Sequence, residues 1–555
     1  MTLRRPPTLL LIGAILLIGL AIRLVNIGFG LPAMYDPDEP LFVLKAFELI
    51  NKQTLNPGWF GHPGTTTIYL LALIDIGVAL VGLGSGAFAT LPQFAAAVYA
   101  NPGLIFIPSR IAMALIGVGT IWLSFLIARR LFDDRVAVVA AAFLALNAVH
   151  VAWSQIIRTD IPCSLFMLAA LLFAIRSGQE GRLRDTVYAA LFAGFATATK
   201  WPGSSVMIAV AGAAFHLGRA DRDFAALVRR LAIATVALLA GLFVASPYIF
   251  LDWRTVIANV GGEVAGGHLG HSGHGFVANL WWFLHLQVAG SMGWAGLALV
   301  IGGFVLIARR RLARATLLPA ALLFLVLIAS QAQIWSRWIT PILPLFAIAA
   351  ALATVSAGRW LAERAAPQWR VAVVPLVASL ALLPSLAGAV VGARERANDT
   401  RAQASAWAIA HIPAGSTVVV EQLALDLRPQ PWRILFPIGE VGCVDGRQIL
   451  KGGVKLEKVQ KARRGSSIVD LGNVASDKLE TCRADYAILT YYDLYLAEQA
   501  GFPDQVERYR ELIGSGRTVA LFRAPAKFAG WPSVRIVALN RRSAAKRVAA
   551  AEPLH

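Results

Sequence analysis

Long apolar runs alternate with short polar segments through the first 393 residues of the chain. An α-helix needs roughly 20 apolar residues to cross the hydrocarbon core of a membrane. The runs predict about eleven membrane helices, so we expect a polytopic α-helical membrane protein. They lie at residues 8–28, 108–128, 136–153, 161–176, 186–199, 202–216, 231–248, 288–308, 315–331, 339–357 and 371–393.

The pattern changes after residue 393, where no further run is long enough to span a membrane. The stretches STVVVEQLALDL and ADYAILTYY have the alternation and β-branched content of strands. TRAQASAWAIAHI and PDQVERYRELIG have helical periodicity. The chain is therefore predicted to have two domains, a membrane module at residues 1–393 and a small soluble α/β domain at residues 394–555.

Composition and charge agree with this division and add an orientation. Only 15% of the residues are charged, against about a quarter in soluble proteins. The net charge is +19, and arginines gather in alternate polar segments, which the positive-inside rule places in the cytoplasm. The net positive charge thus indicates the orientation of the protein in the membrane and not a surface that binds nucleic acid. The arginines are Arg4 and Arg5; Arg129, Arg130 and Arg135; Arg176, Arg182 and Arg184; Arg219, Arg222, Arg229 and Arg230; Arg309, Arg310, Arg311 and Arg314; Arg359, Arg364 and Arg370.

The first loop predicted to face outward, residues 29–107, begins with an acidic stretch, MYDPDEPLFVLKAFELI. It carries Asp36, Asp38 and Glu39 at the start of a helix with one apolar face, which is expected to lie on the membrane surface. A second apolar stretch in this loop, TTTIYLLALIDIGVAL, contains Asp75. A full span here would reverse the side of every later arginine segment, so we expect an interfacial or half-inserted helix.

Several motifs, taken in order, resemble those of the GT-C glycosyltransferases. They are the outward Asp-Glu pair after the first span, GHPG, IIRTDIPCSLFMLAALLFA, ATATKWPG, SPYIFLDW, RWITPILPLFAIAAA and, in the second domain, WAIAHIPAGSTVVVEQ and FAGWPSVRIVAL. Within that superfamily the chain is most similar to bacterial protein O-mannosyltransferases and the lipid A aminoarabinose transferase, families 39 and 83.

The resemblance implies a GT-C type fold in the cytoplasmic (inner) membrane of a bacterium, with the active site and the C-terminal domain outside the cytoplasm. It implies transfer of a sugar from a polyprenyl-phosphate donor to a hydroxyl group of a glycan, lipid or protein acceptor. No cofactor is required by this reaction. Membrane lipids are expected partners, and nucleic acid is not.

The same resemblance assigns roles to acidic residues. It selects Asp38 as the general base, Glu39 as a residue that orients the acceptor or the base, and Asp160 as a second acidic site. Such a transfer needs a base for the acceptor proton and cations for the departing phosphate. For the phosphate we expect Arg337 and Lys200, and after them Arg158, whose position beside Asp160 also allows a simple loop ion pair.

The alternatives for these residues are structural. The three carboxylates at residues 36–39 would then be solvated helix caps. The cations would reach toward lipid headgroups with their stems in the membrane.

Histidines form a further set of candidate ligands. GGEVAGGHLGHSGHGF contains Glu263, His268, His271 and His274, which are metal-ligand types at short spacing. The run is rich in glycine, so no helix is expected to hold these side chains on one face. Hydrogen bonding of His268 and His271 to phosphate or sugar is therefore favoured over a metal site or a plain flexible loop. His62, in GHPG, either contacts the substrate or shapes its turn.

Two other functions stay open at this point. A transporter or flippase of lipid-linked sugars also has many spans, but such proteins usually show internal pseudo-symmetry, and this sequence has no obvious halves. A glycan transferase of the O-antigen-ligase type would not need the acidic loop.

The two cysteines of the predicted outer domain, Cys443 and Cys482, are expected to form a disulfide bond in an oxidising compartment. The alternative is two free thiols that pack as small apolar groups.

Overall fold

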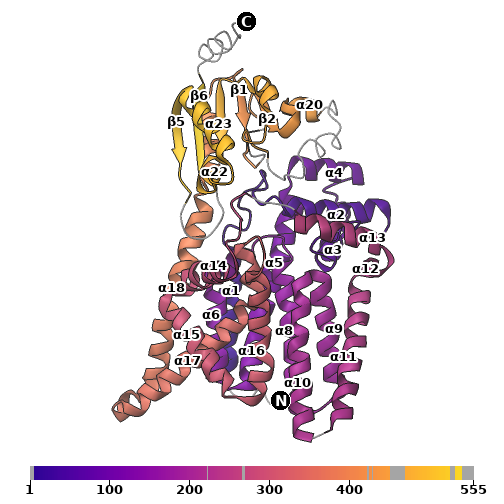
Figure 1. Ribbon diagram of the computed structural model, residues 1–555, viewed down its shortest axis with the longest axis vertical. Helices are drawn as coiled ribbons and strands as arrows, with labels where there is room; N and C mark the ends of the chain where they lie inside the picture. Colours follow the sequence, from indigo (N-terminus) through magenta and orange to yellow (C-terminus); the bar gives the residue numbers. More distant parts are fainter. Residues whose placement is uncertain are drawn as a thin grey trace. The chain divides into compact units, whose positions relative to one another are not determined.

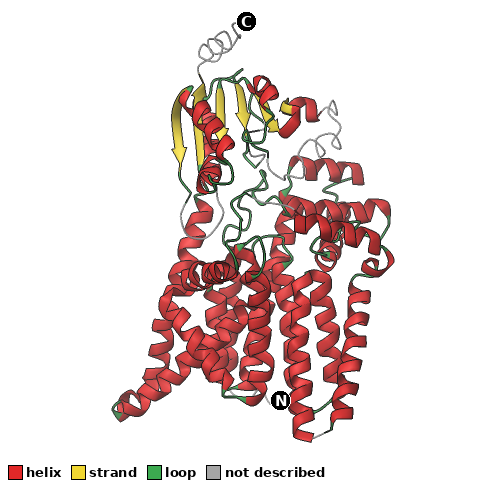
Figure 2. Ribbon diagram, in the orientation of Figure 1, coloured by secondary structure: helices red, strands yellow, loops and turns green. Residues whose placement is uncertain are grey.

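A computed structural model describes residues 6–221, 223–265, 269–421, 424–427, 429–450, 469–524 and 532–539. The chain forms two compact units, one mainly of helices and one built on a sheet (Figure 2). The first comprises Met1–Phe29, Pro37–Val264 and Gly273–Arg394, and the second comprises Gly30–Asp36, Ala265–Ser272 and Glu395–His555. The second unit thus includes two short segments from within the predicted membrane module.

The first unit is a bundle of α-helices (Figure 1). Its helices are α1 (Pro6–Leu24), α2 (Glu39–Lys52), α3 (Thr65–Gly84), α4 (Leu91–Ala100), α5 (Gly103–Leu131), α6 (Asp134–Leu146), α7 (Ala148–Trp153), α8 (Asp160–Glu180), α9 (Leu183–Thr199), α10 (Met207–Asp221), α11 (Phe224–Ala245), α12 (Tyr248–Leu251), α13 (Trp253–Ala265), α14 (Phe276–Trp282), α15 (Gly290–Ala308), α16 (Arg311–Ala329), α17 (Leu343–Arg364) and α18 (Arg370–Ala397). A π-helical segment, Phe283–Ala289, joins α14 to α15, and the 3-10 segments Trp201–Val206 and Ser336–Ile342 precede α10 and α17.

Eight helical segments in the described part of the chain are long and apolar enough to cross a membrane. They are Thr65–Gly84, Gly103–Leu131, Asp160–Glu180, Phe224–Ala245, Phe276–Ala308, Arg311–Ala329, Ser336–Arg364 and Pro367–His411. Seven overlap predicted spans, whereas α1, α6, α9 and α10, which were also predicted to span, fall outside this group. The protein is a polytopic α-helical membrane protein.

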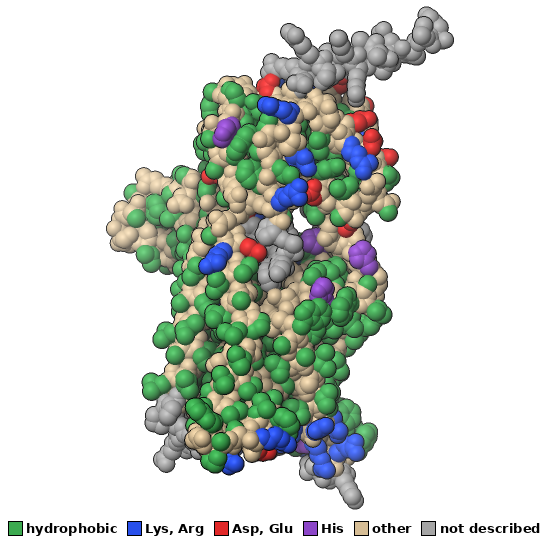
Figure 3. Space-filling view, turned by 90° about the vertical axis from the view of Figure 1, so that its left-hand side faces the viewer, with side chains coloured by type: hydrophobic (Ala, Val, Ile, Leu, Met, Phe, Trp, Pro, Cys, Tyr) green, Lys and Arg blue, Asp and Glu red, His purple; other side chains and the backbone are tan. Residues whose placement is uncertain are grey.

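Burial and surface chemistry fit a bundle that lies in lipid. In Ser336–Arg364, 94% of the most apolar window is buried, so α17 lies at the centre of the bundle. On the face shown in Figure 3, hydrophobic side chains cover the helices, and Lys and Arg side chains gather at the lower end. An apolar belt with cations at its edge is the pattern that a lipid bilayer selects.

The position of α3 bears on the sequence prediction for residues 65–84. The helix meets the end of α9, because Gly64 N donates to Thr199 O at 3.2 Å and the hydroxyls of Thr66 and Thr199 lie 2.6 Å apart. In Figure 1, α2, α4 and α13 run crosswise to the long helices α8–α11. An interfacial position for α3 stays a prediction, because its length and composition also suit a span.

A buried arginine joins three helices at the start of the bundle. Arg23 in α1 is 0% exposed, and its Nη2 lies 2.8 Å from Nδ1 of His150 in α7. A guanidinium can only donate, so Nδ1 accepts and the ring proton is on Nε2, which lies 3.0 Å from Oγ1 of Thr120 in α5. These bonds fasten α7, from which the chain runs on to Arg158.

The second unit is a three-layer α/β domain. Its six-stranded sheet has the order β3-β2-β1-β4-β6-β5, with β1 parallel to β2 and β4 and the other pairs antiparallel. Alternate residues of β1 point to opposite faces, so Val418 and Val420 pack with Ala404 and Ala408 of α19, and Val419 packs with tyrosines of α22 and α23. The elements are β1 (Thr417–Val420), β2 (Arg433–Ile438), β3 (Gly442–Asp445), β4 (Tyr486–Leu489), β5 (Gly516–Phe522), β6 (Val534–Leu539), α19 (Thr400–His411), α20 (Gly446–Leu450), α22 (Tyr492–Ala497) and α23 (Pro503–Gly514).

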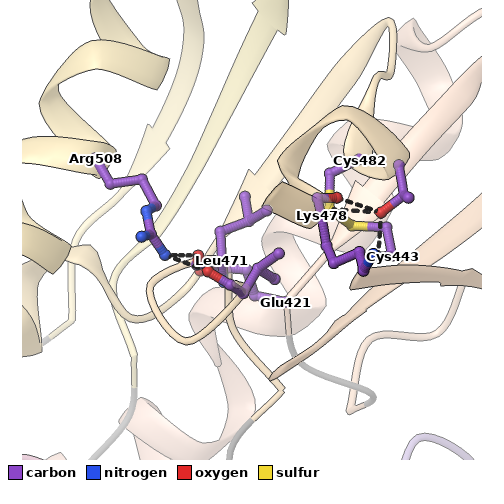
Figure 4. The surroundings of a disulfide bond; sticks show 8 residues. Glu421, Cys443, Leu471, Lys478, Cys482 and Arg508 are labelled. Atoms are coloured by element: carbon purple, nitrogen blue, oxygen red, sulfur yellow. Dashed lines mark hydrogen bonds between the residues drawn. A yellow bond between two sulfur atoms is a disulfide. The ribbon is translucent and has the colours of Figure 1, made fainter. Parts of the chain in front are cut away.

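The predicted disulfide bond is present in this domain. Cys443 in β3 is bonded to Cys482, with 4.9 Å between their Cα atoms (Figure 4). Cys443 N also donates to Oγ1 of Thr481 at 2.7 Å. A bridge that closes a loop of this size stabilises a domain by roughly 3–4 kcal/mol on the chain-entropy model. Cys163, in α8, is free and buried.

A buried carboxylate fastens the carboxyl ends of β1 and β4. Glu421, directly after β1, accepts hydrogen bonds from the backbone N–H groups of Leu471, Thr490 and Tyr491 at 3.0, 2.6 and 3.1 Å (Figure 4 shows Glu421 and Leu471). The Tyr509 hydroxyl also donates to it. Burial, together with the nearby charge of Asp470, raises the pKa of Glu421 to about 7.

Candidate functional site

Five charged side chains from four separate segments of the helical unit come together. Asp38 directly precedes α2, Arg158 and Asp160 flank the start of α8, Lys200 follows α9, and Arg337 lies in the 3-10 segment before α17. Arg158 and Asp38 form an ion pair, as do Lys200 and Asp160. Arg337 joins the two pairs, with its Nη2 3.8 Å from Asp38 Oδ2 and its Nε 4.0 Å from Asp160 Oδ2. We call these five residues the charged cluster.

Exposure separates the members of the charged cluster. The Asp38 side chain is 30% exposed, whereas that of Asp160 is 1% exposed and those of Arg158, Arg337 and Lys200 are 5%, 6% and 9% exposed. Asp38 is therefore the carboxylate that a substrate can reach. Three cations face two carboxylates, so the cluster carries one formal positive charge in excess, which suits an anionic ligand.

Local sequence explains how the cations reach this position. Helix α9 ends at Thr199, and Lys200 adopts an extended backbone (φ −155°, ψ 130°) before a turn that contains Pro202. Arg337 lies 4.0 Å from the centre of the Trp335 ring, so a cation–π contact holds its guanidinium. Asp160 stands in the first turn of α8, where the helix dipole favours a negative charge.

Glu39 lies beside Asp38 in sequence but has different contacts. Its side chain is 0% exposed, and Arg110 in α5 donates to both of its oxygens, Nε to Oε1 at 2.9 Å and Nη2 to Oε2 at 2.6 Å. The backbone N–H of Ile157 also donates to Oε1 at 2.9 Å. Glu39 thus fastens the segment that carries Arg158, as a positioning residue would, and its expected role in orienting the acceptor or the base stays a prediction.

Arg110 is the residue of this region that the sequence analysis missed. Its Nη1 donates to the backbone oxygens of Ile27 and Phe29, at 2.9 and 2.7 Å, so it also fixes the chain that follows α1. The available signal was an arginine within an apolar span, since such residues are usually paired and functional.

The histidines lie in different places. His62, in the turn between α2 and α3, has its ring 5.2 Å from that of Trp59 and 6.3 Å from that of Phe42. His271 belongs to the second unit, and His268 lies outside the described residues. The expected contact of these histidines with phosphate or sugar stays a prediction. Within the described ranges, no three His, Cys, Asp or Glu side chains are placed to hold a metal ion.

Comparisons with known proteins show a family match over part of the chain and a shared fold over nearly all of it. Residues 103–253 match the family described as dolichyl-phosphate-mannose-protein mannosyltransferase. No curated protein sequence matches the chain significantly.

Among solved structures, apo ArnT from Cupriavidus metallidurans is similar with a TM-score of 0.53, at 15% identity, over 96% of this chain and 97% of that chain. The same protein bound to undecaprenyl phosphate gives a TM-score of 0.51, at 16% identity, over 96% and 98% of the two chains. The matched segment includes Arg158, Asp160 and Lys200 of the charged cluster. Residues 103–253 are thus similar to this mannosyltransferase family, and the chain as a whole shares its fold with ArnT.

Proposed function

We propose that this protein transfers a sugar from a polyprenyl-phosphate donor to an acceptor hydroxyl, with Asp38 as the general base. The observation that carries the proposal is the arrangement of Asp38: a partly exposed carboxylate that faces Arg158 and Arg337 and lies at the open side of a cluster with excess positive charge. A base and a phosphate-binding group side by side are what this reaction needs.

The steps follow from the positions of these residues. The acceptor oxygen forms a bond to the anomeric carbon of the sugar, and its proton passes to the Asp38 carboxylate. The bond from that carbon to the phosphate oxygen breaks, and the phosphate leaves with the electron pair. Arg158, Arg337 and Lys200 stabilise the negative charge that develops on the phosphate. Asp160 accepts from Lys200 and thereby orients its ammonium group.

This leaving group does not need a general acid, because a polyprenyl phosphate departs as a stabilised anion. No metal is required on this scheme, since three cationic side chains supply the charge that a metal ion would otherwise supply. The lipid-linked sugar is a substrate, and the acceptor is a glycan, a lipid or a protein.

The relatives support the class of donor. ArnT from Cupriavidus metallidurans is bound to undecaprenyl phosphate in one solved structure, and the matched family is described by a dolichyl-phosphate-mannose donor. By the arginine distribution, the charged cluster and the C-terminal domain face the outside of a bacterial cytoplasmic membrane.

Mass analysis of the envelope glycans tests the function. A strain that lacks the protein is complemented either with the wild type or with Asp38→Asn. We expect one sugar mass to be missing in the deletion strain, restored by the wild type and not by the variant. Restoration by Asp38→Asn would contradict the role of the base. A sugar that accumulates on its carrier inside the cell would favour a flippase.

Reporter fusions test the orientation separately. A reporter after residue 135 is expected to lie in the cytoplasm and one after residue 400 outside it, because residue 135 belongs to an arginine-rich segment. An outside signal at residue 135 would mean that α3 crosses the membrane, and the side assigned to Asp38 would then need to be redrawn.

A further inference from the structure

Two aromatic side chains between α2 and α3 differ in exposure from their neighbours. Trp59 and His62 are half-buried, whereas Phe60, Gly61 and Pro63 are buried. The Trp59 and His62 rings are 5.2 Å apart at an interplanar angle of 69°, and Phe42 of α2 packs edge-on to Trp59 at 5.8 Å from beneath the turn, fully buried. Phe42 is thus part of the core, and the Trp59 and His62 rings are partly exposed.

The backbone of this turn is fixed from several sides. Phe60 N donates to Oδ1 of Asn259 in α13 at 2.8 Å, and the Trp201 indole N–H donates to Phe60 O at 3.3 Å. Gly64 N donates to Thr199 O at 3.2 Å. Each bond ties the turn to a different element, so the backbone that carries Trp59 and His62 is held in place before any ligand binds. This order reduces the entropic cost of binding.

The turn adjoins the charged cluster. Thr199 directly precedes Lys200, and a Cβ atom at Gly64 would lie 3.4 Å from Trp59 and 3.6 Å from Thr159, the residue before Asp160. The same Cβ would lie 2.9 Å from Phe42, and Gly64 has φ +70°, so glycine is required for this close approach. The aromatic pair therefore borders the elements that carry Lys200 and Asp160.

We propose that Trp59 and His62 form a sugar subsite beside the charged cluster. This inference rests on the proposed function and names the part of the site that reads the carbohydrate. A sugar ring presents a face of C–H bonds, whose hydrogens suit the negative face of an indole ring, and an edge of hydroxyl groups, which suit the imidazole nitrogens. The sugar is either the one on the donor or one on the acceptor, since both meet at the charged cluster.

Competing occupants fit less well. A polyprenyl tail favours a continuous apolar surface, and the imidazole beside Trp59 interrupts it. A phosphate is better served by the three cations of the charged cluster.

Binding measurements on the purified full-length protein test the subsite. The probes are undecaprenyl phosphate, undecaprenyl phosphate mannose and methyl α-mannoside, applied to the wild type, Trp59→Ala and Trp59→Phe. If the subsite binds the donor sugar, Trp59→Ala lowers the affinity for undecaprenyl phosphate mannose about tenfold and leaves that for undecaprenyl phosphate unchanged. Trp59→Phe keeps a ring face and retains most of the affinity.

The measurements with the different probes also distinguish a donor sugar from an acceptor sugar. Loss of methyl α-mannoside binding alone, with the donor preference intact, assigns the subsite to the acceptor. Equal weakening of both lipid probes by Trp59→Ala, or no change with any probe, overturns the inference. Trp253→Ala, at a tryptophan of α13 that is 54% exposed, is the matched control and is expected to change nothing.

Failure of the proposed function would look different. In that case the wild type transfers no sugar, or Asp38→Asn transfers it normally, whatever the binding of the probes. His62→Gln, which keeps a hydrogen-bonding edge, is expected to retain more sugar affinity than His62→Ala; equal losses in both variants would remove His62 from the subsite.

Discussion

Replacing Asp38 with asparagine separates catalysis from folding. The change removes one negative charge and preserves the size of the side chain. Solvent-exposed ion pairs contribute about 0–1 kcal/mol to stability, whereas breaking a buried pair costs about 3–5 kcal/mol. Asp38 is 30% exposed, but its partner Arg158 is 5% exposed, so we expect a loss between these two limits, about 1–3 kcal/mol in the free energy of unfolding.

The expected loss of activity is much larger. A general base typically contributes about 10²–10⁴ to the rate, or about 3–5 kcal/mol of activation free energy. The assay is turnover of a polyprenyl-phosphate sugar by the purified variant, with thermal unfolding measured on the same sample. The refuting result is near-wild-type turnover by folded Asp38→Asn. Asp160 would then become the candidate base. Substitution of Asp160 is expected to lower stability and activity together, because it removes the carboxylate that pairs with the buried Lys200.

A matched control lies on α2, the helix that Asp38 directly precedes. Glu48 in α2 forms ion pairs with Lys45 and Lys52 at 3.1 and 3.3 Å, and its side chain is 44% exposed. Glu48→Gln also removes one carboxylate near the start of the chain, yet it is expected to change neither turnover nor unfolding by a measurable amount. A comparable loss in both variants would point to a general effect of charge and not to a base at position 38.

Further predictions concern a cation, the disulfide bond and the buried acid. Arg337→Ala is expected to raise the donor KM at least about tenfold, because a charge-assisted contact to phosphate contributes roughly 1.5–3 kcal/mol; a change in acceptor KM alone would assign Arg337 to the other half of the site. Thiol labelling of the denatured, non-reduced protein should give one label, on Cys163; three labels would remove the Cys443–Cys482 bridge. Since burial raises the pKa of Glu421 from 4.5 to about 7, its contribution of about 3 kcal/mol is present below pH 4.5 and lost as the pH rises through 7. Unfolding of the C-terminal domain, followed by its near-ultraviolet circular dichroism, should therefore need less denaturant at pH 8 than at pH 5, and the opposite order would contradict the assignment.

The lengths of the apolar runs predicted that residues 1–393 form a bundle of membrane helices. Insertion into lipid depends on the composition of a whole helical segment and not on any single residue. The run lengths did not predict where helices break. The run 136–153 is divided into α6 and α7 at Asn147, whose side chain caps the second helix by accepting from His150 N at 3.0 Å. The run 288–308 begins within a π-helical segment and contains Gly293 at φ 74°. Such breaks come from single polar or glycine residues inside otherwise apolar sequence.

The site was predictable as a set of charges but not as a set of contacts. The resemblance to GT-C motifs selected Asp38 and Asp160, and the need for cations beside a departing phosphate selected Arg337, Lys200 and Arg158. Pairing between them depends on how α2, α8 and α9 meet, which no local pattern encodes. Arg110 was overlooked for the same reason, because its partner is 71 residues away in sequence.

The division of labour between Asp38 and Glu39 follows from helix geometry. Neighbouring residues at the start of an α-helix project about 100° apart, so the two carboxylates cannot face the same cluster. Asp38 has helical dihedral angles (φ −88°, ψ −23°) and directs its carboxylate to Arg158 and Arg337, which leaves Glu39 turned toward Arg110. The bidentate Glu39–Arg110 contact then fixes the rotation of α2 about its own axis. An adjacent acidic pair before a proline thus supplies both a reachable carboxylate, which we propose as the base, and the buried bond that sets the direction of that carboxylate.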